Sequence, residues 1–253
     1  MSYDRVIGDD GVSRYYQQAG SGSALVFLHG FSGNHLSWYQ QVPAFADDYR
    51  CIVPDQRMFG RSVDSPSGPG AAAFPDDLVD LLDRLDVDRA AIVGHSMSGW
   101  TATSVATRWP DRVAALVLSG TPGGLISSNR HETVREAGEG SIPDVDPLDP
   151  TSSYLSESIA ELNRDAPEEF VDIRPTLDEL DIDADAIVSA GVPSYLIAGE
   201  ADPFMPSRAL EEVSETLSGA PISVVDGAAH SANFERPEAF NRELRSFLEA
   251  ADY

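Results

Sequence analysis

Ser96 stands in a segment that could expose its hydroxyl group as a nucleophile. Residues 90–94 (AAIVG) form a short apolar run, and the residues that follow the serine have a helical pattern. A serine between a strand and a helix sits on a sharp turn that needs small neighbours, because the two backbones pass closely there. Gly94, Ser98 and Gly99 are small, although Ser98 takes the place of the last glycine in the pattern G-x-S-x-G. Ser96 is therefore the candidate nucleophile, and an ordinary strand-to-helix turn is the alternative.

A free serine is a weak nucleophile, so Ser96 would need a general base and an acid that orients the base. His230 lies between the last predicted strand and the last predicted helix, and Asp202 follows an earlier predicted strand. The chain order serine, aspartate, histidine, with each residue at the end of a strand, predicts a catalytic triad for acyl transfer. Glu200 is the nearest rival of Asp202 for the acidic position, and a solvated loop aspartate is the alternative for Asp202.

The other four histidines are expected to have less direct roles. We expect His29 to be buried and to orient its loop by hydrogen bonds. His95, next to the candidate nucleophile, is expected to be a packing residue. His131 lies in a long polar segment and is expected to be solvated. His35 is expected either to line the mouth of the pocket or to lie at the surface.

Aromatic residues near these positions are either pocket walls or part of the core. Trp38 and Phe204 are expected to line the pocket, with a core position as the alternative, and Trp100 is expected in the core. Asp55 and Arg57 follow a predicted strand. We expect them to hold the loop there by an ion pair or by hydrogen bonds to the backbone.

Short apolar runs alternate with helical patterns along most of the chain. This alternation predicts an α/β fold with a mostly parallel sheet that is covered by helices on both faces. The predicted strands are 13–19, 23–30, 50–54, 90–94, 114–119, 194–199 and 222–225. The predicted helices are 37–46, 74–86, 98–108 and 235–250.

Residues 123–188 do not follow this alternation of strands and helices, because they contain no convincing strand and many acidic residues and prolines. Structureless loops of this length are uncommon in compact domains. We therefore expect a helical lid over a site at the carboxyl edge of the sheet, with a decorated loop as the alternative. The predicted division is a core of residues 1–122 and 189–253 with the lid inserted between them.

Four stretches make the chain resemble the α/β-hydrolase superfamily, in the branch of small esterases, enol-lactonases and cofactor-free haloperoxidase-like proteins. These stretches are His29-Gly30-Phe31, residues 55–62 (DQRMFGRS), residues 94–99 (GHSMSG) and residues 227–237 (GAAHSANFERP). The resemblance covers residues 3–122 and 187–250. Three residues depart from its pattern, because Met58, Ser98 and Ala229 each stand where a glycine is usual, but none of them is a reacting group.

The resemblance implies a serine hydrolase that acts on a small carboxylic ester or lactone through an acyl-enzyme on Ser96. The backbone N–H groups of Phe31 and Met97 would form the oxyanion hole, which stabilises the charge that develops in acyl transfer. No metal or organic cofactor is implied, and the sequence lacks a glycine-rich dinucleotide fingerprint. A serine at position 96 argues against haloalkane dehalogenases and epoxide hydrolases, which need a carboxylate nucleophile.

Three alternatives to this function stay open. The first is hydrolysis of a carbon–carbon bond in a vinylogous diketone, although members of that branch commonly have a tryptophan after the histidine and this chain has Ser231. The second is a perhydrolase or haloperoxidase side activity of the same triad. The third is a non-catalytic ligand-binding protein with this fold, because a fold alone does not define a function.

Acidic residues greatly outnumber basic residues in this chain. The 17 basic residues are all arginine, the acidic residues number 42, and the formal net charge is −25. Such a surface repels nucleic acids and anionic membranes. The pattern resembles proteins of salt-loving organisms, in which molar salt shortens the Debye length to ~3 Å and screens crowded carboxylates.

The remaining sequence features concern the cellular compartment. A single cysteine, Cys51, excludes an internal disulfide and a cysteine-rich metal site. The first residues, MSYDRVIGDD, have no hydrophobic region typical of a secretory signal, and no apolar stretch has membrane-spanning length. We therefore expect a cytoplasmic protein whose partner is a small-molecule substrate. Its oligomeric state and the identity of the substrate are left open.

Overall fold

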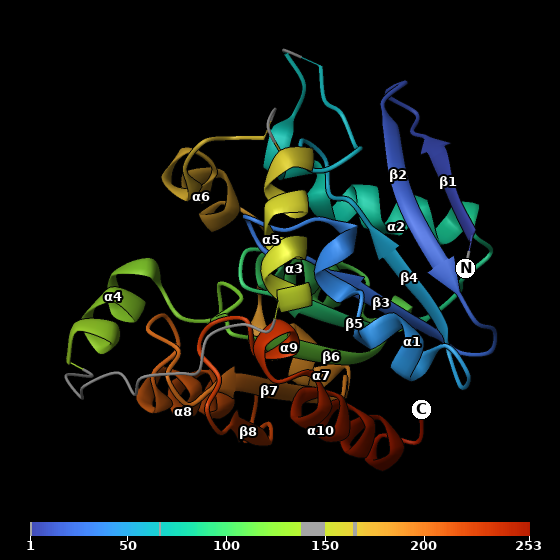
Figure 1. The fold of residues 1–253 in the computed structure, drawn as a ribbon. Helices are drawn as coiled ribbons and strands as arrows, with labels where there is room; N and C mark the ends of the chain where they lie inside the picture. The colour runs from blue at the N-terminus through green and yellow to red at the C-terminus, as the bar shows by residue number, and fades with distance from the viewer. Residues whose placement is uncertain (1, 66, 138–149, 164–165) are drawn as a thin grey trace.

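The computed structural model describes residues 2–65, 67–137, 150–163 and 166–253, and Figure 1 shows their arrangement. The described residues form an eight-stranded sheet in the order β1-β2-β4-β3-β5-β6-β7-β8. Its strands are β1 (Ser2–Ile7), β2 (Ser13–Ala19), β3 (Ala24–Leu28), β4 (Arg50–Pro54), β5 (Ala90–His95), β6 (Val113–Ser119), β7 (Ser194–Gly199) and β8 (Ile222–Val225). The strands from β3 to β8 are parallel, β2 is antiparallel to β4, and β1 is antiparallel to β2. The mostly parallel sheet confirms the predicted fold class.

Every strand that the sequence predicts is present, and the strand β1 is an addition. The side chains of β1 are mostly exposed, so it lacks the apolar run that marks the other strands. β1 pairs with β2 at the edge of the sheet. The central strands β3, β5 and β6 are buried along their whole length. This burial is expected for parallel strands that helices cover on both faces.

Alternate residues of the central strands face two separate cores. In β3, Val26 and Leu28 belong to one hydrophobic cluster, whereas Leu25 and Phe27 belong to the other. This alternation follows from the two-residue period of a strand. Residues of α2, α3, α7 and α8 complete the first cluster, and residues of α1 and α10 complete the second. The bounds of these helices are α1 (Gln41–Phe45), α2 (Phe74–Arg84), α3 (Ser98–Arg108), α7 (Ala184–Ser189), α8 (Ser207–Thr216) and α10 (Pro237–Ala250).

Prolines shorten two of the predicted helices. The predicted helix 37–46 is divided into a 3-10 helix, η1 (His35–Trp38), and α1, because Pro43 lacks the N–H group that a continuous helix would need. The predicted helix 235–250 begins at Pro237 as α10, and a separate short helix, α9 (Ala232–Glu235), precedes it. Proline is well suited to the first helical position. The other 3-10 helices are η2 (Gly70–Ala73) and η3 (Pro110–Arg112).

The described residues between β6 and β7 form helices joined by turns, with no strand among them. Its helices before α7 are α4 (Ser128–Ala137), α5 (Pro150–Leu162) and α6 (Phe170–Asp178). Figure 1 shows α5 in front of α3, with α6 and α4 to the left of it. Residues 138–149 and 164–165 of the predicted lid lie outside the described residues. The division into a core and a lid stays a prediction.

Two further findings concern the burial of the Cys51 thiol and the length and apolar character of the helices. Cys51 is buried in β4, and burial raises the pKa of its thiol to about 12, so the thiol stays protonated at neutral pH. Within the described ranges, no helix combines the length and the apolar character needed to cross a membrane.

Candidate active site

Ser96 lies on the turn between β5 and α3 in a strained backbone conformation. Its φ angle is 52°, in the left-handed region that costs a non-glycine residue ~1–2 kcal/mol. The Ser96 N–H group donates to the Ser119 carbonyl over 2.9 Å, which helps to hold this conformation. A Cβ atom on Gly94 would lie 2.7 Å from the Ser98 carbonyl oxygen, and one on Gly99 would lie 2.4 Å from Thr121. The small residues of the motif are therefore required by close backbone packing.

The three departures from the glycine pattern are accommodated locally. The Ser98 hydroxyl lies 2.8 Å from the Leu28 carbonyl oxygen and 3.0 Å from that of His95, so it finds acceptors at the start of α3. Met58 has a φ angle of 73°, so it adopts the left-handed conformation for which glycine is usual. Ala229 is not among the residues with a positive φ angle, and glycine is not required there.

Ser96, His230 and Asp202 form one hydrogen-bonded chain. His230 Nε2 lies 2.9 Å from Ser96 Oγ, and His230 Nδ1 lies 3.0 Å from Asp202 Oδ2 and 3.1 Å from Oδ1. The Asp202 carboxylate is buried and also accepts the Phe204 N–H over 2.8 Å. Since Nδ1–H donates to the carboxylate, Nε2 is the acceptor for the serine hydroxyl. This arrangement can remove a proton from Ser96 when the oxygen attacks a carbonyl group.

Glu200, the rival for the acidic position, has a different contact. Its Oε2 accepts the Gly227 N–H over 3.1 Å and makes no hydrogen bond to His230. Glu235 is a site residue that the sequence reasoning missed. Its carboxylate accepts the N–H groups of Ala229 and Ser231, over 2.5 and 2.9 Å, and so fixes the backbone on both sides of His230. Its place in α9, five residues after the histidine, is the signal that could have identified it.

His95 and His29 are buried, and the ring of each lies within hydrogen-bond distance of a backbone carbonyl group. The His95 Nδ1 atom lies 3.1 Å from the Ser119 carbonyl oxygen, and burial, with a smaller contribution from the charge of His230, lowers the pKa of His95 to about 3. His29 accepts the Gln56 N–H at Nε2 over 3.0 Å, and its Nδ1 lies 2.8 Å from the Gly30 carbonyl. Burial also lowers the pKa of His29. Both rings are therefore neutral at pH 7.

Two expected pocket residues lie elsewhere, and one expected surface residue lies in the pocket. His35 is buried beside Asp55, with its Nδ1 2.8 Å from Asp55 Oδ1, so both expected positions, the pocket mouth and the surface, are wrong. Trp38 is fully buried against Phe27 at a ring-centroid distance of 4.9 Å, so it belongs to the core. His131, expected to be solvated, is buried, and its Nε2 lies 2.6 Å from the Phe204 carbonyl oxygen.

A large cavity of about 470 Å³ opens above the Ser96 hydroxyl. Ser96 and His230 line it together with Phe31 and Met97, the two residues whose N–H groups are predicted to form the oxyanion hole. Phe204 lines it as predicted, with its ring centroid 4.7 Å from that of His230. Further walls come from α3, α5 and α6, through Trp100, Ile159, Phe170 and Arg174. The oxyanion-hole role of Phe31 and Met97 stays a prediction.

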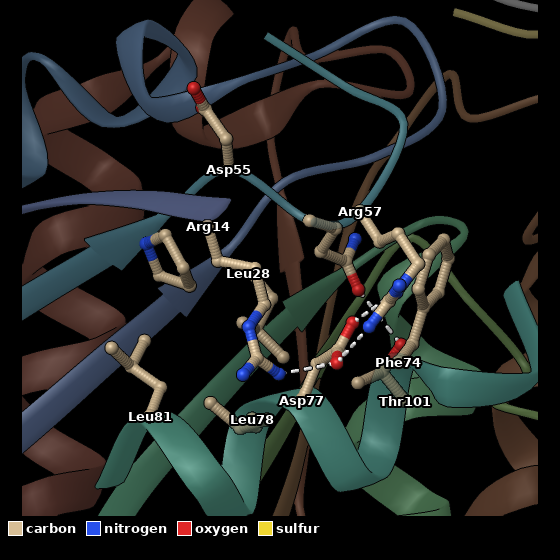
Figure 2. A pocket seen from close by; sticks show the side chains of 11 residues that line it. Arg14, Leu28, Asp55, Arg57, Phe74, Asp77, Leu78, Leu81 and Thr101 are labelled. Atoms are coloured by element: carbon tan, nitrogen blue, oxygen red, sulfur yellow. Dashed lines mark hydrogen bonds and ion pairs between the residues drawn. The ribbon is translucent and has the colours of Figure 1, made fainter. Parts of the chain in front are cut away.

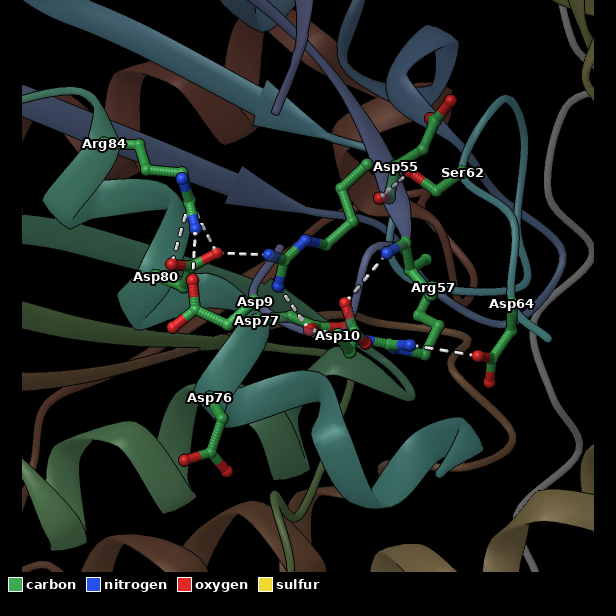
Figure 3. Close-up of polar contacts among 12 residues, drawn as sticks. Asp9, Asp10, Asp55, Arg57, Ser62, Asp64, Asp76, Asp77, Asp80 and Arg84 are labelled. Carbon is green, nitrogen blue, oxygen red and sulfur yellow. Dashed lines mark hydrogen bonds and ion pairs between the residues drawn. The ribbon is translucent and has the colours of Figure 1, made fainter. Parts of the chain in front are cut away.

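The loop after β4 is held by buried charges rather than by an ion pair between Asp55 and Arg57. Asp55 accepts the N–H groups of His35 and Arg61, over 2.6 and 2.8 Å. Arg57 contacts three other carboxylates, at 2.6 Å for Asp10, 2.9 Å for Asp64 and 2.7 Å for Asp77 (Figure 3). The hydrogen bonds to these aspartates, above all to Asp77, raise the pKa of Arg57.

This charge network borders a second, much smaller cavity of about 20 Å³. Figure 2 shows Arg14 and Arg57 converging on Asp77 beside it, with Leu78 and Leu81 of α2 closing the apolar side. A volume of this size is about that of one water molecule, so it cannot hold an organic substrate. In the parts of the chain that the structure describes, no group of three or more His, Cys, Asp or Glu side chains is arranged to hold a metal ion.

The sheet order, the strained serine turn and the hydrogen-bonded chain define the class of fold. The chain has the α/β-hydrolase fold, and the sequence profile for the alpha/beta hydrolase fold matches residues 23–141. Among curated proteins, the chain is 26% identical to "Putative carbamate hydrolase RutD" of Rhizobium rhizogenes over 243 residues, which are 89% of this chain and 92% of that protein.

Solved structures of hydrolases resemble the chain over nearly its full length. A thermophilic esterase from Thermogutta terrifontis has a TM-score of 0.77 and 25% identity, covering 99% of both chains. Est816, described as an N-acyl homoserine lactone degrading enzyme, has a TM-score of 0.74 and 27% identity, covering 96% of this chain and 100% of its own. The similarity therefore extends beyond the residues 23–141 that the family profile matches.

Proposed function

We propose that the protein is a serine hydrolase that cleaves a small carboxylic ester or lactone through an acyl-enzyme on Ser96. The observation that carries the proposal is the continuous chain Ser96 Oγ–His230 Nε2 (2.9 Å) and His230 Nδ1–Asp202 Oδ2 (3.0 Å) at the floor of the 470 Å³ cavity. The similarity to an esterase and to a lactone-degrading enzyme supports the same chemistry. Cavities of 300–1,000 Å³ are typical of sites for small molecules.

In the proposed mechanism, Ser96 Oγ forms a bond to the carbonyl carbon of the substrate while its proton passes to His230 Nε2. The charge on the former carbonyl oxygen is stabilised by the N–H groups of Phe31 and Met97. The bond from carbon to the leaving oxygen then breaks, and His230 returns the proton to that oxygen. Asp202 keeps the imidazole in the correct tautomer and stabilises the imidazolium.

Water completes the cycle by the same steps. His230 takes a proton from the water as its oxygen attacks the acyl carbon, and the bond between that carbon and Ser96 Oγ breaks. His230 then returns the proton to Ser96. The left-handed φ of Ser96 contributes to this chemistry, because the sharp turn presents Oγ to the cavity rather than to the helix.

Carbamate cleavage is a second candidate function. It is favoured by the match to RutD, which covers 89% of this chain. A carbamate has the same electrophilic carbonyl carbon, so the proposed roles of the three triad residues would not change. The carbon–carbon hydrolase and the non-catalytic binding protein remain outcomes of the test below.

The test is the hydrolysis of p-nitrophenyl butanoate by the wild type and by Ser96→Ala. Turnover is expected to fall by several orders of magnitude in S96A, because the members of a triad act as one unit. A fluorophosphonate should label Ser96 in the wild type, as located by mass spectrometry. The matched control is Ser158→Ala on α5, whose hydroxyl contacts the Tyr154 carbonyl over 3.3 Å and is outside the cavity wall. If S96A retains more than a tenth of the wild-type rate, the proposed mechanism is wrong.

A further inference from the structure

The lining of the large cavity has the opposite charge bias from the chain as a whole. The chain has 42 acidic residues and a net charge of −25, yet none of the described residues that line the cavity is Asp or Glu. Arg174 is the one arginine among them. An arginine in a wall whose described residues include no acid favours an anionic ligand, because the surrounding walls focus its field, although its ion pair with Asp178 offsets part of the charge.

Arg174 is held in place by aromatic rings. It lies in the second turn of α6, four residues after Phe170, so both side chains share one face of the helix. Its guanidinium carbon lies 4.6 Å from the centre of the Trp100 ring and 5.6 Å from that of Phe170. Asp178, one turn further along, accepts its Nε–H over 2.9 Å. These contacts orient the guanidinium group before a ligand arrives, which lowers the entropy cost of binding.

The guanidinium group is also partly removed from solvent. The Arg174 side chain is 23% exposed, compared with 68% for Arg242 on the outer surface of α10. Charge-assisted hydrogen bonds are stronger in such partly desolvated places than at an open surface. The planar fork of arginine matches the geometry of a carboxylate, which can accept two parallel N–H bonds.

Arg174 and His230 both line the cavity but have different aromatic neighbours. His230 is packed by Phe204, which follows β7, whereas Arg174 is packed by Trp100 and Phe170. Phe170 in turn contacts Phe31, the predicted oxyanion-hole residue, at a ring-centroid distance of 5.7 Å. Figure 1 shows α6 well separated from β7 and β8. Arg174 lines the same cavity as Ser96 and His230, so a ligand that reaches Ser96 can also contact Arg174.

From this arrangement we propose that Arg174 binds a second, ionised carboxyl group of the substrate, so that the preferred substrates are anionic esters such as monoesters of short dicarboxylic acids. The inference rests on the proposed function for the ester cleavage, but the carboxylate site itself rests on Arg174 and on the lack of Asp and Glu among the described residues of the wall. Hydrolysis of such a monoester adds water across the ester bond and yields a dicarboxylic acid and an alcohol. Arg174 is a substrate-binding residue in this scheme and takes no part in the proton transfers.

The kinetic test compares monoethyl glutarate with ethyl glutaramate, in which a neutral amide replaces the carboxylate at nearly constant shape. Acid release is followed in a pH-stat. The wild type should have a kcat/KM at least tenfold higher for monoethyl glutarate. Arg174→Gln should lower that value about tenfold, mainly through KM, and should leave ethyl glutaramate within about twofold, since a charge-assisted pair at a partly exposed site contributes about one power of ten. Arg174→Lys should recover part of the loss, because it keeps the charge and loses the fork.

The matched control is Arg242→Gln, which removes the same charge from an exposed position paired with Glu243. It should leave both substrates unchanged. Thermal melts of all variants verify that they are folded. If the wild type hydrolyses both substrates equally and R174Q changes neither, the inference is overturned while the proposed function stands.

A binding measurement separates failure of the inference from failure of the proposed function. Calorimetric titration of glutarate into Ser96→Ala should give saturable binding, which the double variant with Arg174→Gln should lose. If no ester is turned over but glutarate binds through Arg174, the proposed function fails and the carboxylate site is retained. If glutarate binds S96A equally with and without Arg174, or does not bind at all, the inference is wrong.

Discussion

The imidazole rings of His95 and His230 lie 5.0 Å apart, centre to centre, at an interplanar angle of 45°. The His230 ring is held by Asp202, and the His95 ring is held by the Ser119 carbonyl group. Burial, with a smaller contribution from the adjacent His230, lowers the pKa of His95 to about 3. The neighbour of the proposed base is therefore a neutral ring across the physiological pH range, and it neither competes for the proton nor repels it by charge.

This relationship predicts a pH-dependent stability with a defined sign. His95 takes up a proton near pH 6.5 when the chain is unfolded but only near pH 3 when it is folded. The unfolded state therefore binds more protons in this window, and the free energy of unfolding falls as the pH falls from 6.5 toward 3. At pH 5 the loss from this group is about 2 kcal/mol.

The measurement is urea unfolding at pH 7, 6 and 5 for the wild type and for His95→Gln, whose amide can still donate to Ser119. The variant should lose less stability between pH 7 and pH 5 than the wild type does. Buried His29, whose pKa is also lowered by burial, contributes the remaining slope of the same sign. An identical slope in H95Q would contradict the assignment of a low pKa to His95.

Glu235 is predicted to support catalysis without touching the substrate. Its two carboxylate oxygens accept the N–H groups of Ala229 and Ser231 on either side of His230. Glu235→Gln replaces one acceptor with an NH₂ group that faces an N–H donor, so the loop shifts. We expect kcat to fall about tenfold with little change in KM, because small displacements of a catalytic group reduce the rate. The control is Glu238→Gln, an exposed position in α10, and equal rates in both variants would count against the positioning role.

The hydrogen-bonded chain of Ser96, His230 and Asp202 could be predicted because its signals are local. Ser96, Asp202 and His230 each follow an apolar run, and parallel strands bring their carboxyl ends to one edge of the sheet. The choice of Asp202 over Glu200 also proved consistent with the hydrogen bonds to His230. The fold class followed from the same alternation of strands and helices, which is a property of short stretches of sequence.

The residues that escaped prediction depend on contacts between distant segments. His35 is buried because Asp55, 20 residues away, accepts from its backbone and side chain. His131 is placed by the Phe204 carbonyl group, 73 residues away. No local sequence pattern marks Arg174 as a residue of the cavity wall, because its position depends on contact with the Trp100 ring of another helix. Such pairings are set by tertiary packing, which periodicity does not encode.

Arg57 is predicted to be a strong stability determinant of the loop after β4. Its side chain is buried, and Asp10, Asp64 and Asp77 surround it. Arg57→Met leaves their carboxylates without this cation, and the loss of one partner of a buried ion pair costs about 3–5 kcal/mol. Chemical denaturation should show this loss, whereas Arg242→Gln, at an exposed pair, should change stability by less than about 1 kcal/mol. A loss below that level in R57M would show that the network is dispensable.

The helices between β6 and β7 are predicted to set the acyl-chain preference. Phe170 of α6 and Ile159 of α5 line the cavity above Ser96. Phe170→Ala removes a ring from the wall, so kcat/KM should shift toward longer acyl chains, by about tenfold between octanoate and butanoate p-nitrophenyl esters. Val188→Ala on α7, outside the cavity wall, is the comparison variant. An unchanged chain-length profile in folded F170A would refute the lid role of α6.

The acidic surface is predicted to make stability depend on salt. At ~0.1 M salt the Debye length is about 10 Å, so neighbouring carboxylates of this chain, with its net charge of −25, repel one another. Near 1 M it is ~3 Å, and most of the repulsion is screened. Unfolding spreads the charges, so low salt favours the unfolded state. The exposed ion pairs, such as Arg108 with Asp76, are weakened by salt, but they contribute only about 0–1 kcal/mol each.

Net repulsion therefore outweighs the exposed ion pairs and decides the sign of the salt effect on stability. Potassium and sodium chloride should both raise the melting temperature, with most of the gain below about 1 M. Thermal melts from dilute buffer to 4 M KCl test this expectation. Activity should follow the folded fraction, because the described residues that line the cavity around Ser96 and His230 include no Asp or Glu whose repulsion salt would screen. A continued rise above 1 M would require another cause, such as the salting-out of apolar groups. A melting temperature that stays flat or falls across the range would mean that the acidic surface is no adaptation to salt.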